Sequence, residues 1–338
     1  MARSDPHGIA DNENGNTEET MKRTLGAFLL GISACLGAIA PAPAQAESFP
    51  EKPITLYVAY RAGGGTDTMG RVAAKIMGDH LGQQVNVVNK PGAGGGLAAL
   101  TLMRERPDGY TILLDSSEPL TLGPFLNKEL RYELDDFDYI GMLASYQPGL
   151  ISPINRDYDT LEEFLVHAKE VPGQKFAFFS AGAKMVMQYI ALQEGLEFRY
   201  VPTKGGSDAV NLIISDQVDV TWSGGIHARY PDQVKLIAAA TSERHAGSPD
   251  VPTFIESGVP LSTNTSMVFM APKGTPPEIL AILEEAVKAA TEHPDLKKLS
   301  AKIQVPISYM SASDTREELD RQLANYQKMI DAVGIETQ

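Results

Sequence analysis

Cysteine is almost absent from this chain of 338 residues, which contains only Cys35. One cysteine excludes a disulfide framework, a zinc centre built from several cysteines and an iron–sulfur cluster. Basic residues are also in the minority, because 29 lysines and arginines face 43 aspartates and glutamates and give a net charge of −14. Binding of nucleic acid or anionic lipid requires a basic surface, so neither is expected as a partner.

Motifs for catalysis and nucleotide binding are missing as well. The sequence has no His-Glu-x-x-His and no Gly-x-Ser-x-Gly, and neither glycine-rich loop continues into a P-loop or a Gly-x-Gly-x-x-Gly fingerprint. The histidines beyond the N-terminal segment stand alone in sequence. We therefore predict no catalytic residues, no metal and no cofactor, and a protein that is not an enzyme. The alternative is an exported α/β hydrolase or lyase acting on a small acid, which would need a nucleophile and a base that meet only in space.

The N-terminal residues predict an export signal instead of a folded domain. A basic start at Met21-Lys22-Arg23 precedes an apolar run over 25–39, and the segment 41–46 ends in the small-x-small pattern that signal peptidase cleaves. The run is too short to span a membrane, which takes about 20 apolar residues. We assign 21–46 as a cleaved signal peptide and 1–20 as a mis-assigned start, and we expect the protein in the periplasm.

Cleavage after residue 46 changes the charge little and removes the cysteine. Three basic and five acidic residues are lost, so 26 basic residues face 38 acidic ones and the net charge becomes −12. The alternative is a lipoprotein signal, because residues 32–35 read Ile-Ser-Ala-Cys and would place a lipid anchor on Cys35. In both cases the protein works outside the cytoplasm.

Alternating strand and helix patterns predict an α/β fold in two series. The first series has strand 54–60, helix 66–81, strand 85–88, a helix from 97 and strand 110–114, and the second begins near 161. Such alternation favours parallel strands with helices on both faces, so each lobe is predicted as a mostly parallel sheet flanked by helices. The amphipathic helices after 277 are expected to return to the first sheet. Lobe 1 then comprises 47–147 and 265–338, lobe 2 comprises 148–264, and two chain crossings form a hinge.

Two glycine-rich loops follow predicted strands of lobe 1 and each opens a helix. They are Gly63-Gly64-Gly65 and Gly92-Ala93-Gly94-Gly95-Gly96. The first amide N–H groups of a helix have no internal partner and favour an anion, and such loops lie in the crevice at the carboxyl ends of parallel strands. We predict an anion site there, to which Ser116 and Ser117 could add hydroxyl donors. The alternative is that the glycines only form tight turns.

Seven short motifs follow one another in a distinctive order along residues 49–338. They are 49–67, 88–95 (Val-Asn-Lys-Pro-Gly-Ala-Gly-Gly), 107–113 (Pro-Asp-Gly-Tyr-Thr-Ile-Leu), 201–206 (Val-Pro-Thr-Lys-Gly-Gly), 216–220, 249–258 and 271–276 (Ala-Pro-Lys-Gly-Thr-Pro). In this order they resemble the Bug-type receptors of tripartite tricarboxylate transporters. The resemblance implies a soluble, monomeric periplasmic receptor whose two lobes close on a small organic carboxylate and present it to an integral-membrane permease, or equally to a sensor kinase.

The resemblance also implies ligand-binding residues by position. In lobe 1 the family grips a carboxylate through backbone amides and bridging waters, which here implies Tyr60, Gly63, Gly64, Thr66 and Asp67 in the first loop and Gly92, Ala93 and Gly94 in the second. In lobe 2 a family loop corresponds to residues 180–188, which implies Ser180 and Gly182, and the positions of Thr203, Trp222 and Ser223 follow later landmarks.

Departures from the family pattern suggest the kind of ligand. Arg61 and Lys184 replace smaller residues, Thr203 replaces a tyrosine, and Trp222-Ser223 replaces a Phe-Asp pair. Two cations on facing loops predict a dicarboxylate ligand. Trp222, Met185 and Met187 would offer an apolar wall suited to an aromatic ring, although ordinary core packing is the alternative for these three.

Overall fold

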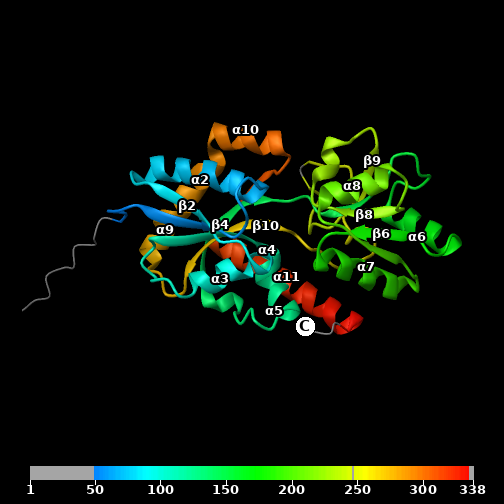
Figure 1. The fold of residues 1–338 in the computed structure, drawn as a ribbon, viewed down its shortest axis with the longest axis horizontal. Coiled ribbons are helices and arrows are strands. Elements are labelled where there is room, and N and C mark those ends of the chain that lie inside the picture. The colour runs from blue at the N-terminus through cyan, green and yellow to red at the C-terminus, as the bar shows by residue number, and fades with distance from the viewer. Residues whose placement is uncertain (1–48, 246, 335–338) are drawn as a thin grey trace, which may run out of the picture. The chain divides into compact units, whose positions relative to one another are not determined.

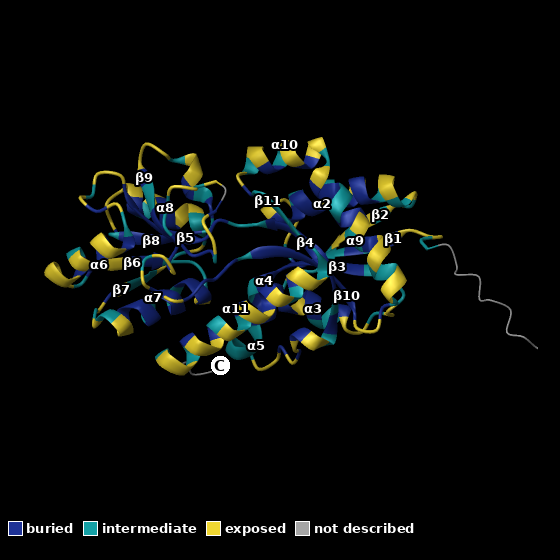
Figure 2. Cartoon of the chain, turned by 180° about the vertical axis from the view of Figure 1, so that it is seen from behind, coloured by how far each residue is buried: buried dark blue, intermediate teal, exposed yellow. Residues whose placement is uncertain are grey.

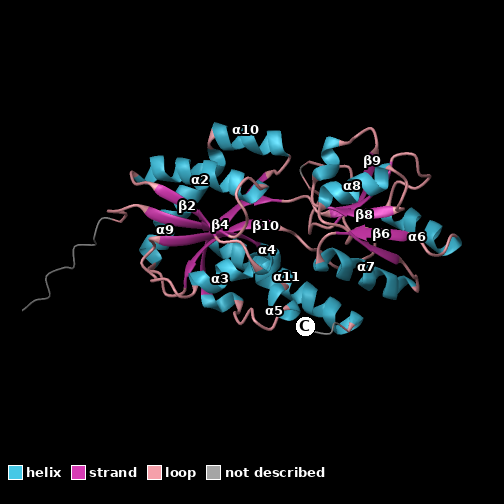
Figure 3. Cartoon of the chain, in the orientation of Figure 1, coloured by secondary structure: helices cyan, strands magenta, loops and turns pink. Residues whose placement is uncertain are grey.

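The structure, a computed structural model, describes residues 49–245 and 247–334. Their strands form two sheets, a six-stranded sheet in the order β11-β4-β10-β3-β1-β2 and a five-stranded sheet in the order β7-β6-β8-β5-β9 (Figures 1 and 3). We call the first sheet with its helices lobe 1 and the second sheet with its helices lobe 2. The predicted signal peptide, the segment 1–20 and Cys35 lie outside the described residues.

Lobe 1 has helices on both faces of its sheet. On one face lie α2, α9 and α10, and on the other lie α3, α4, α5 and α11. Helix α2 shows why: its buried residues Met69, Ala73, Ile76 and Met77 recur at helical spacing and form one apolar stripe. The elements are β1 (Ile54–Val58), α2 (Gly65–Leu81), β2 (Val85–Asn89), α3 (Gly96–Leu102), β3 (Thr111–Ser116), α4 (Ser117–Thr121), α5 (Gly123–Leu126), β4 (Phe137–Ser145), β10 (Ser266–Pro272), α9 (Pro277–Glu292), α10 (Pro294–Ile303), β11 (Ile307–Met310) and α11 (Ala312–Val333), with 3-10 turns η1 (Ala93–Gly95) and η2 (Leu134–Asp136).

Lobe 2 is built in the same way around the smaller sheet. Helices α6 and α7 pack in one core cluster, and α8 packs in another with residues of β5, β6 and β9. Thr160 and Glu163 form a capping box that begins α6. The elements are β5 (Gly149–Pro153), α6 (Leu161–Glu170), β6 (Lys175–Phe178), α7 (Ala181–Glu194), β7 (Arg199–Pro202), α8 (Gly206–Ile214), β8 (Val220–Ser223), η3 (Ile226–Arg229) and β9 (Val234–Ala239).

Both sheets are mixed, which corrects the expectation of mostly parallel sheets. In lobe 1, β1 pairs in parallel with β2 and β3, whereas β10 pairs antiparallel with β3 and β4, and β4 pairs antiparallel with β11. In lobe 2, β6 is parallel to β7 and β8, whereas β5 is antiparallel to β8 and β9. The reason is that β4 leads out of lobe 1 and β10 leads back into it, so the two neighbours must run in opposite directions.

Two segments carry the chain between the lobes, and they are hydrogen-bonded to each other. Tyr146 N–H donates to the Thr265 carbonyl (2.7 Å), and Ala240 N–H donates to the Pro148 carbonyl (2.8 Å). The strands on either side of the first crossing, β4 and β5, were not predicted. Almost every residue of both is buried, so they lack the polar-apolar alternation that marks a half-exposed strand (Figure 2).

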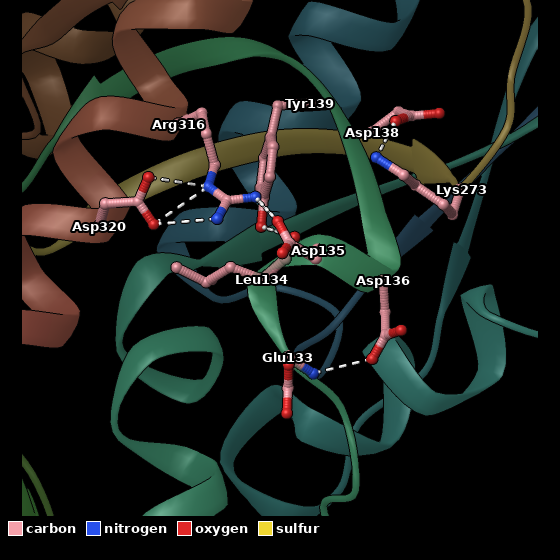
Figure 4. Close-up of polar contacts among 9 residues, drawn as sticks. All are labelled: Glu133, Leu134, Asp135, Asp136, Asp138, Tyr139, Lys273, Arg316 and Asp320. Atoms are coloured by element: carbon pink, nitrogen blue, oxygen red, sulfur yellow. Dashed lines mark hydrogen bonds and ion pairs between the residues drawn. The ribbon is translucent and has the colours of Figure 1, made fainter.

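The C-terminal helix α11 returns to lobe 1 and then continues to lobe 2. Near its start, Arg316 forms ion pairs with Asp135 (2.6 Å) and Asp320 (3.0 Å), while Lys273 pairs with Asp138 nearby (Figure 4). Leu319 is buried in the core of lobe 1. Near the C-terminal end of the same helix, Tyr326 and Met329 are buried in the core that contains α7 of lobe 2. Helix α11 is therefore shared by both lobes.

Candidate ligand-binding site between the lobes

A pocket of about 670 Å³ lies between the two sheets. Lobe 1, lobe 2 and the two crossing segments all contribute to its wall. The lining residues are Tyr60, Gly63–Thr66, Thr68, Ser116, Glu118 and 303–305 from lobe 1, Tyr146, Pro148 and Thr265 from the crossings, and Phe179, Ser180, Gly206, Ser207, Trp222, Gly224–Ile226 and Arg229 from lobe 2. An adjoining pocket of about 500 Å³ shares Tyr60, Ser116, Glu118, Phe179 and Ser180 and adds Ala93 and Gly94.

The first glycine loop presents the start of α2 to this pocket. Gly64 is the N-cap residue and supplies no side chain to the amides of the first turn. The helix has 17 residues, so those amides and the helix dipole favour an anion. Thr66 also lines the pocket, and its hydroxyl lies 3.0 Å from that of Tyr146.

Asp67 supports this loop from behind instead of facing the pocket. Its carboxylate accepts hydrogen bonds from Gly63 N–H (2.8 Å) and from the Asn89 amide (2.8 Å), and it pairs with Arg71 (2.9 Å). Burial alone would raise the pKa of Asp67, but these hydrogen bonds hold the pKa below its ordinary value. The carboxylate stays charged and fixes the shape of the loop.

The second glycine loop differs from the first because its amides are used internally. Gly95 and Leu97 both donate their N–H groups to the Gly92 carbonyl, and Gly96 donates to Ala93. Ala93 and Gly94 line the adjoining pocket, whereas Gly92 lines neither pocket. Tyr60 joins the two loops, since its hydroxyl donates to the Gly94 carbonyl (3.1 Å).

A buried carboxyl group, that of Asp115, lies behind Tyr60 and Ser116. Oδ1 accepts the Ser116 N–H (2.7 Å), and Oδ2 has no hydrogen-bond partner among the described residues. Burial raises the pKa of Asp115 to about 7. Gly95 packs directly against it, because a Cβ on Gly95 would lie 2.6 Å from Oδ1.

Glu118 was not predicted, yet it lines both pockets and reaches across to lobe 2. Its carboxylate accepts hydrogen bonds from the Ser180 hydroxyl and the Gly182 amide at the start of α7. Burial raises the pKa of Glu118, and these two hydrogen bonds oppose the rise. Ser180 and Gly182, expected to contact the ligand, therefore bind a carboxylate of the protein itself.

Of the other residues predicted in lobe 2, Trp222 lines the pocket and the rest do not. The Lys184 ammonium lies 5.9 Å from the ring centroids of Phe178 and Tyr200. Thr203 donates its hydroxyl to the Phe178 carbonyl (3.0 Å). Met185 and Met187 are buried in the lobe 2 core, and Arg61 of lobe 1 is exposed outside both pocket linings.

Ser223 and His227 are in contact, as a nucleophile and base in a hydrolase would be, but the serine hydroxyl is occupied by hydrogen bonds from the backbone. Ser223 Oγ lies 2.7 Å from His227 Nδ1 and also accepts the N–H groups of Gly225 (3.1 Å) and His227 (3.4 Å). Both side chains are buried, Ser223 does not line the pocket, and burial lowers the pKa of His227 to about 4. The serine is thus a cap for the turn that leads into η3.

Lobe 2 instead offers two features that the sequence prediction missed. Helix α8 begins at the pocket with Gly206 and Ser207, and its N-cap Gly205 has no capping side chain. Arg229 is the one cationic residue in the lining of the larger pocket, and it donates to the Ile303 carbonyl of lobe 1 (3.2 Å). The Gly205-Gly206 pair before a helix was a usable signal for the first, but no local pattern marks Arg229.

Within residues 49–245 and 247–334, no helix is long and apolar enough to cross a membrane. Among the same residues, no three histidine, cysteine or acidic side chains gather as metal ligands. Two α/β lobes with a ligand-sized pocket between them define the fold of the periplasmic binding proteins, so the fold class predicted from the sequence is confirmed.

Comparison with known proteins identifies the family. The profile described as "Tripartite tricarboxylate transporter family receptor" matches residues 69–335. A UPF0065 protein of Cupriavidus necator is 34% identical over 91% of this chain and 96% of its own length, and BugT of Bordetella pertussis is 32% identical over 78% and 83%. The chain belongs to the tripartite tricarboxylate transporter receptor family. The resemblance seen in the sequence is confirmed, and this is a family of receptors and not of enzymes.

Solved structures agree with this assignment. A TctC solute-binding protein from Polaromonas superposes with a TM-score of 0.76 at 26% identity, covering 84% of this chain and 99% of that one. The periplasmic binding protein BugD superposes with a TM-score of 0.66 at 26% identity, covering 86% and 100%.

Proposed function

We propose that the protein is a monomeric periplasmic receptor that binds a small dicarboxylate between its lobes and delivers it to the permease of a tripartite transporter. The observation that carries the proposal is the pocket, which has an anion-favouring helix start in each lobe. One ligand carboxylate binds the amides at the start of α2 with the Thr66 hydroxyl. The second binds the start of α8 and Arg229.

The middle of the ligand lies against apolar side chains. Phe179, Trp222, Ile226 and Val305 also line the pocket, in addition to the two helix starts. They suit a hydrocarbon spacer and would accept an aromatic ring. Charge-assisted hydrogen bonds at both ends, each contributing about 1.5–3 kcal/mol, then determine affinity, because the protein as a whole is acidic and does not attract anions.

Closure of the lobes couples binding to delivery. The ligand contacts both lobes, so it stabilises the arrangement in which they face each other. The permease would recognise that closed arrangement. A sensor kinase that reads the same closed state is the alternative partner.

Isothermal titration calorimetry with two acids of equal chain length tests the proposal. Glutarate has two carboxylates and pentanoate has one, so wild-type protein is expected to prefer glutarate. Arg229→Gln should weaken the binding of glutarate about tenfold, or by about 1.4 kcal/mol, and leave the binding of pentanoate nearly unchanged. The matched control is Arg61→Gln, which removes an exposed cation outside the pocket lining.

Either of two results would contradict the proposal. One is that a broad panel of carboxylates fails to raise the melting temperature of the wild-type protein, although a ligand at a hundred times its Kd stabilises by about 2.7 kcal/mol. The other is that Arg229→Gln weakens the binding of glutarate and of pentanoate by the same factor. Native mass spectrometry of freshly purified protein would identify a co-purified acid directly.

A further inference from the structure

One anion-favouring helix start at the pocket is already filled by the protein. Helix α7 has 14 residues and begins beside Ser180, which lines both pockets. The N-terminus of such a helix attracts a carboxylate. Here that carboxylate belongs to Glu118 of lobe 1, which accepts hydrogen bonds from the Ser180 hydroxyl and the Gly182 amide.

The contact is close and leaves no room at the helix start. A Cβ on Gly182 would lie 3.1 Å from Glu118 Oε1 and 3.1 Å from the Tyr326 hydroxyl of α11. Ser180 is doubly engaged, because its hydroxyl also accepts the Ala183 N–H (3.2 Å). The Ser180 hydroxyl and the Gly182 and Ala183 amides are therefore engaged before any ligand arrives.

Among residues 49–245 and 247–334, no cationic side chain pairs with Glu118. The titratable groups that interact electrostatically with Glu118 are the hydroxyls of Tyr60 and Tyr326. Tyr60 also interacts with the buried Asp115. The groups that bind Glu118, the Ser180 hydroxyl and the Gly182 amide, are neutral. A further anion at this side of the pocket would meet a negative charge with no counter-charge beside it.

We propose that Glu118 is a specificity-determining residue that excludes an additional carboxylate from the α7 side of the pocket. The inference rests on the proposed function, since it assumes a carboxylate ligand between the α2 and α8 ends. With two carboxylates placed there, the third carboxylate of a tricarboxylate would face Glu118. This receptor therefore selects dicarboxylates over tricarboxylates of the same carbon skeleton.

The test uses two acids that differ by one carboxylate, glutarate and propane-1,2,3-tricarboxylate. Wild-type protein is expected to bind glutarate more tightly in calorimetric titrations at constant pH. Glu118→Gln keeps a carbonyl oxygen to accept from Ser180 and Gly182 but removes the charge, and it should reduce the ratio of the two affinities about tenfold. The matched control is Glu162→Gln, the same change at an exposed position on α6.

Each outcome decides one way. A reduced ratio in Glu118→Gln, with the wild-type ratio kept in Glu162→Gln, supports the proposal. Equal weakening of both acids would mean that Glu118 only joins the lobes, and an unchanged ratio would mean that it does not select; both overturn the proposal. If Glu118→Gln does not fold, Glu118→Asp withdraws the carboxylate by one methylene, and an unchanged ratio there overturns the proposal too.

Failure of the proposed function is separately visible. In that case the wild-type protein binds neither acid nor any other carboxylate, and the variants are not needed to see it. If only the selectivity proposal fails, the wild-type protein still binds glutarate.

Discussion

The hydroxyls of Thr66 and Tyr146 lie 3.0 Å apart and join the first turn of α2 to the segment that crosses from β4 to β5. Both residues line the pocket. A ligand bound at the start of α2 is thereby linked to the crossing about which the lobes would move. We therefore expect this contact to connect ligand binding to the relative position of the lobes.

Removal of this hydroxyl tests the link. Tyr146→Phe is expected to weaken glutarate binding about fivefold, because a hydrogen bond contributes about 1 kcal/mol. The control Tyr309→Phe removes a hydroxyl that is bonded to Glu284, and neither residue lines the pocket, so affinity should be unchanged. Calorimetry on both variants decides, and equal affinities would show that the Thr66–Tyr146 contact is irrelevant to binding.

Gly95 should tolerate no side chain. Its φ of +122° disfavours L residues, and a Cβ there would lie 2.6 Å from Asp115 Oδ1 and 2.9 Å from Pro119 Cγ. Gly95→Ala is expected to lower the free energy of unfolding by more than about 2 kcal/mol. Gly274→Ala is the control, with φ of +89° but open space around the Cβ, and should cost about 1 kcal/mol. Urea denaturation measures both, and equal losses would contradict the role of the Asp115 contact.

Asp115 makes the protein less stable as pH rises. Its pKa is about 7 when folded and 3.8 ordinarily, so between these values the folded state binds more protons than the unfolded state. The stability that this group contributes is therefore full below about pH 4 and is lost by about pH 7, at about 1.4 kcal/mol per pKa unit.

The variant Asp115→Asn isolates this effect, because the amide oxygen can still accept the Ser116 N–H. The free energy of unfolding of the variant relative to wild type is expected to rise between pH 4 and pH 7. Denaturation curves at several pH values measure the difference. A difference that does not change with pH would show that Asp115 is not the titrating group.

Lys184→Ala should leave dicarboxylate binding unchanged within about a factor of two, in contrast to the effect expected of Arg229→Gln. The ammonium of Lys184 lies over the rings of Phe178 and Tyr200, and the residue does not line the pocket. A tenfold loss of glutarate affinity in Lys184→Ala would instead restore the sequence-based hypothesis of two cations on facing loops.

The parts of the site that the sequence predicted are those that local chemistry determines. Glycine turns before helices identified the loop with Gly63 and Gly64, and the end of a predicted strand identified Ser116. The family resemblance identified Thr66 and Ser180, and all five residues line the pocket. The motif order also led to the family, which the comparisons confirm.

The residues that were missed depend on the tertiary fold. Glu118 and Arg229 carry the charges of the larger pocket, but they lie in the short helix α4 and in the 3-10 turn η3, whose sequences hold no recognisable motif. They come together at the pocket only because the lobes face each other. The second loop is as rich in glycine as the first, yet three of its N–H groups donate to the carbonyls of Gly92 and Ala93. Composition cannot distinguish a free amide from one that is bonded within its own turn.

Helix α11 has a consequence for how the protein is made. The core of lobe 2 includes Tyr326 and Met329, about 90 residues beyond the last strand of that lobe, and the hydrogen bond from Asn325 to Ser262 ties the helix to the second crossing. During synthesis, β5 to β9 therefore emerge without the side chains that complete their apolar interior. Lobe 2 reaches its final packing only when α11 has been synthesised. A truncation within α11 should therefore expose hydrophobic surface in lobe 2, although the deleted residues are far from that lobe in the sequence.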